Sequence, residues 1–352
     1  MDNTFSNYLF LSFVGADYSR ASVYLYQNLN ETPYKIIKLT PAFNYFFIEL
    51  LSKRKILRAK NLTIVVLSPC SILVPFLKII TGRPIVLDAG WPLTDAELGN
   101  VNRHAFNLRY IKSWVIDFLA FHLAKKTILE SQSQKAYVSK FYFVSKSKLE
   151  VVFTGVNENK YTIEMDDSAP SNYLKILNED FVLFRGKNNT ESGIENIIKI
   201  ADISSNAYKF VIVSNKMPTN FKEDANVVFI SEYLQDLEIA LLYQKCFLSL
   251  GQISDSKRLD RTIPHKAFES GYFGTPYLTL KRDGIAEFLS GGSEAIFVDT
   301  VNIVNIAKII EEFHSNFVLQ KELKINIKKR YSKIASQTKL KRDFFKILDG
   351  IN

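Results

Sequence analysis

Two successive series of short apolar runs, separated by helical segments, constrain the fold of this chain more than any other feature. Runs that are apolar at every position suit strands buried on both faces, and such strands occur in parallel sheets covered by helices. The runs of the first half are 8–13, 35–39, 62–67, 84–87, 127–129 and 151–153. Between them, 43–58 and 111–124 have helical patterns. The alternation predicts an α/β domain with a doubly wound parallel sheet.

The same alternation starts again in the second half. Its apolar runs are 181–184, 210–213, 227–230, 246–250, 276–280 and 295–298. The segments 194–201 and 237–244 are helical in pattern and lie between these runs. A second doubly wound domain with the same Rossmann-like architecture follows from this repetition.

A polar, turn-rich segment at 157–172 marks the seam between the two series. We therefore expect an N-terminal domain over 1–160, a C-terminal domain over 161–335 and a final segment over 336–352. Ligands of open parallel sheets bind beyond the carboxyl ends of the strands. Two such sheets are expected to face a cleft, which is the default ligand site.

Composition narrows the class of protein. The chain has 352 residues, 47% of them hydrophobic, which suffices for two cores of ordinary size. Its two cysteines, Cys70 and Cys246, lie in apolar runs and are expected to be buried free thiols. The N-terminus lacks the pattern of a signal peptide, and prolines and serines interrupt the longest apolar stretch, 62–77. These features favour a cytoplasmic protein.

The net charge of +9 favours anionic partners, such as nucleotide phosphates, acidic lipid headgroups or nucleic acid. Basic residues concentrate at 52–60 and at 321–346, and each segment is equally compatible with a solvated helix face. The stretch 43–60 is aromatic first and basic later, which predicts peripheral contact with an anionic membrane surface. No DNA-binding or RNA-binding module is recognisable, so we do not expect a nucleic-acid partner.

The strongest constellation of polar residues is TIPHKAFESGYFGTP at 262–276. Pro264 and His265 open a helix whose first amides are unpaired and can hold a phosphate. Lys266 adds positive charge beside them, and Glu269, one turn later, can accept two hydrogen bonds from a ribose diol. An ordinary helix with a surface glutamate and a turn at Gly274 is the structural alternative. The spacing is typical of a nucleotide site.

This segment resembles the donor-domain signature of GT-B glycosyltransferases, particularly the retaining family 4. Glu269 matches the second glutamate of the family's E-x7-E motif, which binds the nucleotide ribose. Arg261 stands at the position of the first glutamate, which contacts the transferred sugar in the family. The chain is more similar to relatives with a P-x-K-x-x-E variant.

Further segments resemble the same family in the same order. LFRGKNNTESG at 183–193 resembles the loop that cradles the pyrophosphate, with Gly186 matching, Lys187 in place of the arginine and Ser192 in place of the lysine. RDGIAEFL at 282–289 resembles the loop that supplies Glu287 to the donor. The C-terminal helices resemble the segment that crosses back to the first domain. The resemblance implies that Lys187, Lys266 and Arg261 are catalytic and that Gly186, Pro264, His265, Glu269 and Glu287 bind the donor.

The N-terminal half offers fewer candidates. Gly15 follows the first strand and could approach the donor, and Arg20 in the next helix could assist the acceptor. Asp88 and Trp91 follow another strand, so both are predicted to bind the acceptor, with Trp91 as a platform for a sugar. A turn cap for Asp88, a core position for Trp91 and a surface position for Arg20 are equally compatible with the sequence. No histidine has metal-ligand spacing, and we expect neither a metal nor a cofactor.

The sequence therefore predicts a glycosyltransferase that moves a sugar from a UDP- or GDP-sugar to a glycan or polyprenyl-linked acceptor. Surface polysaccharide synthesis at the inner face of a bacterial membrane is the expected setting. A catalytically inactive GT-B relative that serves as a partner or scaffold protein is the main alternative, because of Arg261 and Ser192. An epimerase or phosphorylase with the same fold also remains open.

Overall fold

The computed structural model describes residues 7–15, 19–26, 34–98, 108–161, 176–219, 221 and 226–351. The chain forms two compact units. Unit 1 comprises 1–157 and 337–352, and unit 2 comprises 158–336. The expected seam at 157–172 falls partly on 162–172, which lies outside the described residues.

Unit 1 is built on a six-stranded parallel sheet whose strand order is β2-β1-β3-β4-β5-β6. The expected strands are present, with β6 beginning two residues before the predicted run of 151–153. The strands are β1 (Tyr8–Ser12), β2 (Ile36–Lys38), β3 (Thr63–Leu67), β4 (Ile85–Gly90), β5 (Lys126–Leu129) and β6 (Leu149–Val151). The order reverses between β1 and β3, which defines the point in this sheet where ligands of such folds bind.

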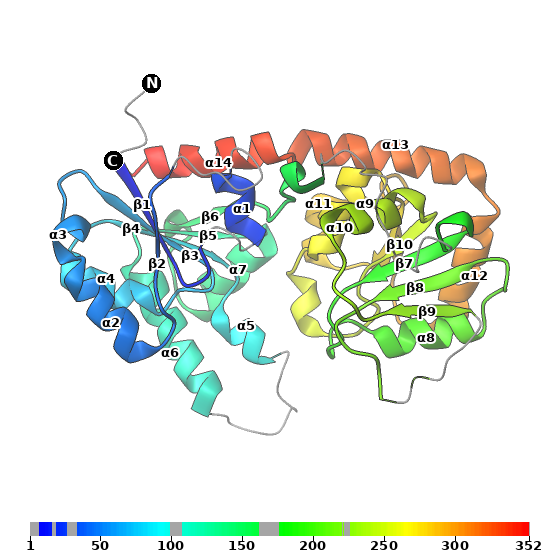
Figure 1. The fold of residues 1–352 in the computed structure, drawn as a ribbon, viewed down its shortest axis with the longest axis horizontal. Helices are drawn as coiled ribbons and strands as arrows, with labels where there is room; N and C mark the ends of the chain where they lie inside the picture. Colours follow the sequence, from blue (N-terminus) through cyan, green and yellow to red (C-terminus); the bar gives the residue numbers. More distant parts are fainter. Residues whose placement is uncertain are drawn as a thin grey trace. The chain divides into compact units, whose positions relative to one another are not determined.

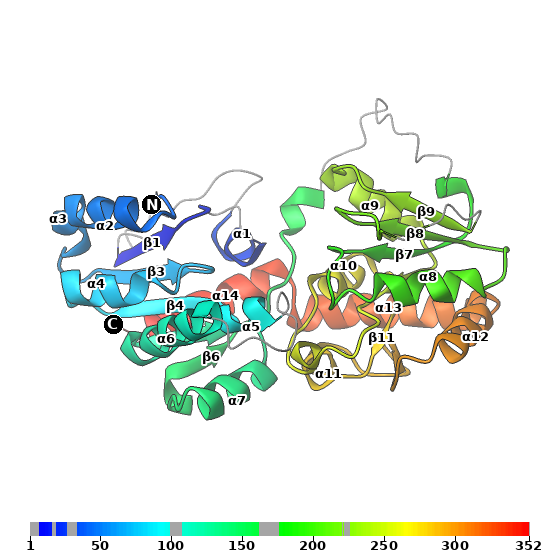
Figure 2. The same ribbon diagram turned by 90° about the horizontal axis from the view of Figure 1, so that it is seen from below.

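Helices cover both faces of this sheet, as continuous apolar strands require. Those of unit 1 are α1 (Ser19–Leu25), α2 (Phe43–Ser52), α3 (Arg54–Leu57), α4 (Leu73–Thr81), α5 (Leu93–Leu98), α6 (Leu108–Leu123), α7 (Gln132–Phe141) and α14 (Gln337–Asp349). Helices α2, α4 and α6 contribute to one apolar core, and α1 and α14 contribute to the core on the opposite face (Figures 1 and 2).

The final helix, α14, belongs to unit 1 although it follows all of unit 2 in the sequence. It packs against α1 (Figure 1), and the rings of Tyr24 and Phe344 stack at a centroid distance of 4.6 Å. The Tyr8 hydroxyl donates a 2.6 Å hydrogen bond to Asp349 Oδ1. The C-terminal segment thus completes the core on this face of the sheet.

Unit 2 repeats the architecture with the strand order β12-β11-β10-β7-β8-β9. All neighbouring strands are parallel, and the order reverses between β7 and β10. The strands are β7 (Phe181–Arg185), β8 (Lys209–Val213), β9 (Val227–Ile230), β10 (Leu248–Leu250), β11 (Tyr277–Leu280) and β12 (Ile296–Val298). Two doubly wound parallel sheets confirm the predicted fold class.

The helices of unit 2 are α8 (Ile194–Asp202), α9 (Asp236–Lys245), α10 (His265–Phe273), α11 (Asp283–Phe288), α12 (Ile303–His314) and α13 (Phe317–Ile334). Cys246 was expected to begin a strand but instead ends α9, where its amide donates to the carbonyl of Leu242. A capping box at Gln235 and Glu238 fixes the start of α9. The helix continues to Lys245, so β10 begins only at Leu248. Both cysteines are buried free thiols, as expected.

A buried ion pair fastens α1 to the sheet of unit 1. Arg20 Nε and Nη2 donate to Asp88 Oδ1 at 3.2 and 2.8 Å, and both side chains are at most 1% exposed. The second amino group, Nη1, donates to the Val152 carbonyl and to Thr154 Oγ1 at 3.1 Å each. The left-handed Gly90 (φ +67°) leaves room for this side chain, since a Cβ there would lie 2.9 Å from Arg20 Cδ.

We predict that Asp88→Ala destabilises the chain by about 3–5 kcal/mol, because it leaves the Arg20 charge buried without its partner. Thermal unfolding measures this change. Glu312→Ala, which breaks the exposed Lys308–Glu312 pair, is the control and should change stability little. An Asp88→Ala variant as stable as the Glu312→Ala variant would contradict the structural role of the pair.

Candidate functional site

Unit 2 gathers polar side chains at the carboxyl ends of β7 and β10, where its strand order reverses. Leu250 at the end of β10 pairs in register with Phe184 of β7 and Leu278 of β11, so these strand ends lie level with one another. The loops that follow β7 and β10 and the helix α10 therefore meet at the same edge of the sheet. Ligands of this fold class bind at such an edge.

Glu269 is the centre of this group and is fully buried. Its Oε1 accepts a 2.5 Å hydrogen bond from Arg185 Nη1 and a 3.3 Å hydrogen bond from the Tyr161 hydroxyl. His265 Nδ1 lies 3.3 Å from the same oxygen. The Tyr243 hydroxyl donates to Oε2 at 2.8 Å. Both carboxylate oxygens are thus engaged inside the unit.

The surroundings of Glu269 keep it ionised. Burial alone would raise the pKa of this carboxyl, but the Arg185 guanidinium, His265 and the Tyr243 hydrogen bond hold the pKa well below its usual range. In turn, the negative charge of Glu269 raises the pKa of Arg185. The pair is a charged, hydrogen-bonded link between α10 and the end of β7.

Arg185 is a residue that the sequence analysis missed. It is the last residue of β7, and its side chain is 33% exposed. The motif comparison assigned the family's arginine position to Lys187, which is exposed, and it is Arg185, two residues earlier, that bonds to Glu269. The signal in the sequence was a charged residue that ends an apolar run directly before a glycine.

Lys266 occupies an unusual position for an ammonium group. The residue is 7% exposed, and its Nζ lies over the ring of Phe184 at 3.7 Å from the centroid. A Cβ on Gly186 would lie 3.0 Å from that Nζ, so the absence of a side chain at 186 makes space for the lysine. Among the described residues, the structure gives this ammonium no hydrogen-bond acceptor.

Burial lowers the pKa of Lys266 to about 7, with the positive charge of Arg185 acting in the same direction and the Glu269 carboxylate opposing both. A buried ammonium without an acceptor is costly in the absence of an anion. The side chain is therefore suited to an anion that reaches the loop at Gly186.

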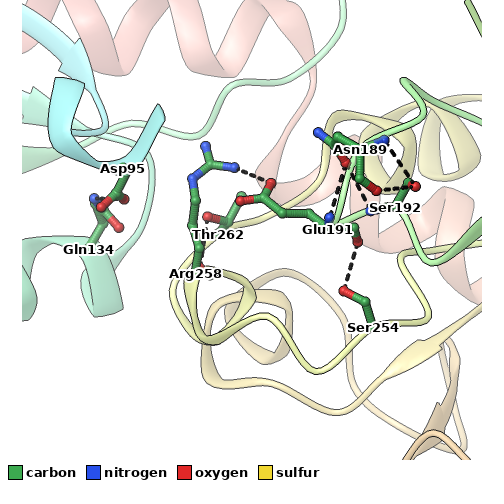
Figure 3. A network of polar contacts seen from close by, with 8 residues as sticks. All are labelled: Asp95, Gln134, Asn189, Glu191, Ser192, Ser254, Arg258 and Thr262. Carbon is green, nitrogen blue, oxygen red and sulfur yellow. Dashed lines mark hydrogen bonds and ion pairs between the residues drawn. The ribbon is translucent and has the colours of Figure 1, made fainter. Parts of the chain in front are cut away.

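The loop after β7 is fixed to the loop after β10 by a second set of contacts (Figure 3). Asn189 Oδ1 accepts from the backbone amides of Glu191 and Ser192 at 3.1 and 2.9 Å. Arg258 Nη1 donates to Glu191 Oε2 at 2.7 Å, and the Ser254 hydroxyl donates to the Glu191 carbonyl at 2.9 Å. Ser192 is thus part of the loop's own framework.

Gly193 is required where the two loops meet. It has φ +69°, and a Cβ at this position would lie 2.1 Å from the Ile253 carbonyl oxygen. It precedes α8 directly, so the close approach also sets the start of that helix.

The other predicted residues of unit 2 lie around this edge. Pro264 is buried and adopts an extended conformation directly before α10, and His265 is the first residue of that helix. Arg261 ends a 3₁₀ turn, Lys257–Asp260, and its carbonyl carbon would lie 2.6 Å from a Cβ on Gly284. The backbone of Arg261 therefore packs closely against Gly284 of α11. Glu287 lies on α11, and its carbonyl accepts a 3.2 Å hydrogen bond from Arg330 Nη2.

The predicted residues of unit 1 have different environments. Gly15 has φ +76° after β1, directly before 16–18, which lie outside the described residues. Trp91 follows β4 and is half-buried. Arg20 and Asp88 form the buried pair described above, so neither can touch an acceptor in this conformation. The sequence analysis treated the two residues separately and missed their pairing.

No group of three or more His, Cys, Asp or Glu side chains in the described part of the chain could hold a metal ion. No helix among those residues has the length and apolar character needed to cross a membrane.

Comparison with solved structures relates this architecture to known proteins. HepE of Anabaena, solved in complex with UDP, superposes with a TM-score of 0.73 over 98% of this chain and 100% of its own, at 14% identity. Its complex with UDP-glucose gives the same TM-score over 98% of this chain and 99% of its own, again at 14% identity.

Sucrose-phosphate synthase of Thermosynechococcus elongatus superposes with a TM-score of 0.70 over 98% of this chain and 99% of its own, at 14% identity. A glycosyltransferase of Rickettsia africae gives 0.67 over 97% of this chain and 98% of its own, at 14% identity. The chain has the GT-B fold. No family model and no curated protein sequence matches it.

The shifted pKa of Lys266 predicts how stability depends on pH. Between pH 7 and 10.5 the unfolded chain holds the Lys266 proton and the folded chain does not, so this residue makes stability rise with pH across that window. The Lys266→Met variant lacks this contribution. From pH 6 to pH 10, the free energy of unfolding of the unmodified protein should therefore rise by about 3–5 kcal/mol relative to that of the variant.

Unfolding curves of both proteins over this pH range test the prediction. Taking the difference between the two proteins cancels the titrating groups that do not interact with Lys266, and the shifts of Glu269 and Arg185 move their titration away from this pH range. A difference that stays constant with pH would show that Lys266 titrates normally in the folded chain.

Proposed function

We propose that this chain is a glycosyltransferase that uses a nucleotide-sugar donor. The observation that carries the proposal is Lys266, a buried ammonium without an acceptor beside Gly186, at the edge where this fold class binds ligands. A nucleoside diphosphate would offer phosphate oxygens to this ammonium group. The structural similarity to proteins solved with UDP and UDP-glucose supports a UDP-sugar, and a GDP-sugar is the other candidate.

Cleavage of the donor leaves negative charge on the departing diphosphate. Lys266 and the positive end of the α10 helix dipole would stabilise this charge. Lys187 is exposed on the loop after Gly186 and could add a second positive charge from the solvent side. We propose this electrostatic role for both lysines and place Arg261 near the transferred sugar. We also propose that the transferred sugar retains its anomeric configuration.

The ribose is proposed to bind Glu269, as the resemblance to the family implies. Because the Glu269 side chain is only 1% exposed and its donors surround it, a ribose diol must displace one of these donors to reach the carboxylate. Arg185 and His265 are the exposed ones, with side chains 33% and 37% exposed. We propose that one of them leaves Glu269 when the donor binds and that Pro264, Gly186, Glu287 and Gly15 shape the rest of the donor site.

For the acceptor, we propose a glycan or a polyprenyl-linked glycan of the kind used in bacterial surface polysaccharide synthesis. The half-buried Trp91 is the acceptor candidate whose exposure suits contact with a sugar ring. The burial of Arg20 and Asp88 argues against direct contact and favours a supporting role for both. A lipid-linked acceptor would hold the protein at the cytoplasmic face of the membrane.

A non-catalytic role as a partner or scaffold protein is the second candidate. Arg261 replaces the acidic residue that contacts the transferred sugar in the family, and the carboxylate of Glu269 is buried beneath its own hydrogen-bond donors. Such a protein could bind a nucleotide without turning over a sugar donor. An assay for hydrolysis or transfer of the donor sugar distinguishes the two candidates, because only the glycosyltransferase would release or transfer the sugar.

Ligand-induced thermal stabilisation tests the donor site directly, because binding to the folded state raises its stability. We predict that UDP or a UDP-sugar raises the melting temperature, whereas ADP-sugars do not. Lys266→Met should weaken nucleotide binding by roughly 10- to 100-fold, as expected for the loss of a hydrogen bond between charged groups. Glu269→Gln, which keeps the shape of the side chain, should also weaken it.

Lys199→Met is the matched control, since Lys199 is an exposed lysine of α8 in the same unit. This variant should bind nucleotide like the unmodified protein. Equal stabilisation of the Lys266, Glu269 and Lys199 variants by UDP would sink the site assignment. Stabilisation by no nucleotide at all would sink the proposed activity.

A further inference from the structure

Helix α6 carries an apolar stripe that no other element covers in the described part of the chain. Leu108, Ile111, Val115 and Leu119 are 82%, 41%, 43% and 40% exposed. They recur at intervals of three and four residues, which places them on one face of the helix. The opposite face packs into the core of unit 1 through residues such as Phe121. The helix is therefore apolar on its inner face and on part of its outer face.

Helices α2 and α4 also expose large apolar side chains. Tyr45, Ile48 and Leu51 of α2 recur every three residues and are 63%, 65% and 45% exposed. On α4, Ile79 is 80% exposed. Single exposed apolar residues are ordinary on protein surfaces, but such residues gathered on neighbouring elements mark interaction sites.

These helices form one layer. Helix α4 packs against both α2 and α6, and all three contribute to the same apolar core on one face of the sheet (Figures 1 and 2). The short helix α3, which follows α2, contacts α2 and α4. We call the outer side of α2, α3, α4 and α6 the helical face of unit 1.

One of the two basic regions of the chain lies in the same place. Residues 34–83, which include α2, α3 and α4, hold nine Lys and Arg residues and one acidic residue, Glu49. The segment therefore has a net charge of +8 (9 − 1), and the other basic region, 321–346, has the same net charge from ten Lys and Arg and two acidic residues (10 − 2). The Glu49 carboxylate accepts a 2.8 Å hydrogen bond from the Thr40 hydroxyl. The helical face thus combines exposed apolar side chains with a strong positive charge.

We propose that the helical face of unit 1 docks on an anionic lipid bilayer. Apolar side chains can enter the boundary between headgroups and acyl chains, while Lys and Arg side chains bind the anionic headgroups around them. The charge argues against a second copy of this chain as the occupant, because two copies of a face with an excess of positive charge would repel each other. The exposed aliphatic side chains argue against nucleic acid, whose backbone requires polar contacts.

This inference goes beyond the proposed sugar transfer, because docking needs no nucleotide and uses no residue of the donor site. It would bring unit 1 to the surface in which a polyprenyl-linked acceptor resides.

Flotation of the full chain with vesicles tests the proposal. We expect binding to vesicles in which phosphatidylglycerol replaces part of the phosphatidylcholine and much weaker binding to pure phosphatidylcholine. Reversing three charges, with Lys53→Glu, Arg54→Glu and Lys55→Glu, should weaken binding at least roughly a hundredfold. The matched control is Lys321→Glu, Lys329→Glu and Lys333→Glu on α13, which changes the net charge equally and should leave most of the binding.

A second pair of variants tests the apolar part. Leu108→Ser, Ile48→Ser and Ile79→Ser remove one highly exposed side chain from each of α6, α2 and α4 and should reduce binding about tenfold or more. Val304→Ser, Phe317→Ser and Val318→Ser in unit 2 remove side chains of similar exposure and should reduce binding little. All variants should keep the melting temperature and the response to UDP, which separates a failure of docking from a failure of the donor site.

Several results would overturn the proposal. One is equal loss of vesicle binding in the two charge-reversal variants, which would reduce the effect to overall net charge. Another is binding that does not depend on phosphatidylglycerol. A third is a dimer in solution that the apolar variant of the helical face dissociates, with no vesicle binding, which would identify a second copy as the occupant. Tight, strongly salt-dependent DNA binding without vesicle binding would overturn it as well.

Discussion

The ion pair between Arg185 and Glu269 is the interaction on which the arrangement of unit 2 depends. It joins the last residue of β7 to the middle of α10, and it does so inside the unit, where a lone charge would be unstable. Two tyrosine hydroxyls and a histidine complete the shell of Glu269. With this link in place, α10 begins at the switch point of the sheet and presents its first turn toward the loop at Gly186.

A fixed α10 explains the position of Lys266. Its side chain starts one helical turn before Glu269 and extends over Phe184 to Gly186, where there is no side chain to block it. Burial of the Lys266 charge costs free energy, and a bound anion at this position would offset that cost. The pair thus fixes the position of α10, and the lysine beside it provides a positive charge that can bind an anion.

The sequence predicted the fold well because strands buried on both faces leave continuous apolar runs, and these runs are local. It predicted the candidate edge of the sheet because Pro264, Lys266 and Glu269 lie within one helical segment. The partners of these residues were harder to find. Tyr161 and Tyr243 resemble core aromatics in sequence, and Arg185 lies 84 positions from Glu269. Asp88 and Arg20, 68 positions apart, resembled separate surface candidates until the fold paired them. Pairings of distant residues carry no local pattern.

A structure of the chain with bound UDP tests the central claim most directly, because the claim is about where one anion lies. The account predicts the diphosphate at the loop after β7, with a phosphate oxygen about 3 Å from Lys266 Nζ and the ammonium turned away from the Phe184 ring. It also predicts that Arg185 or His265 leaves Glu269 to make way for the ribose. A UDP molecule bound elsewhere, with Lys266 still lying over Phe184, would contradict it.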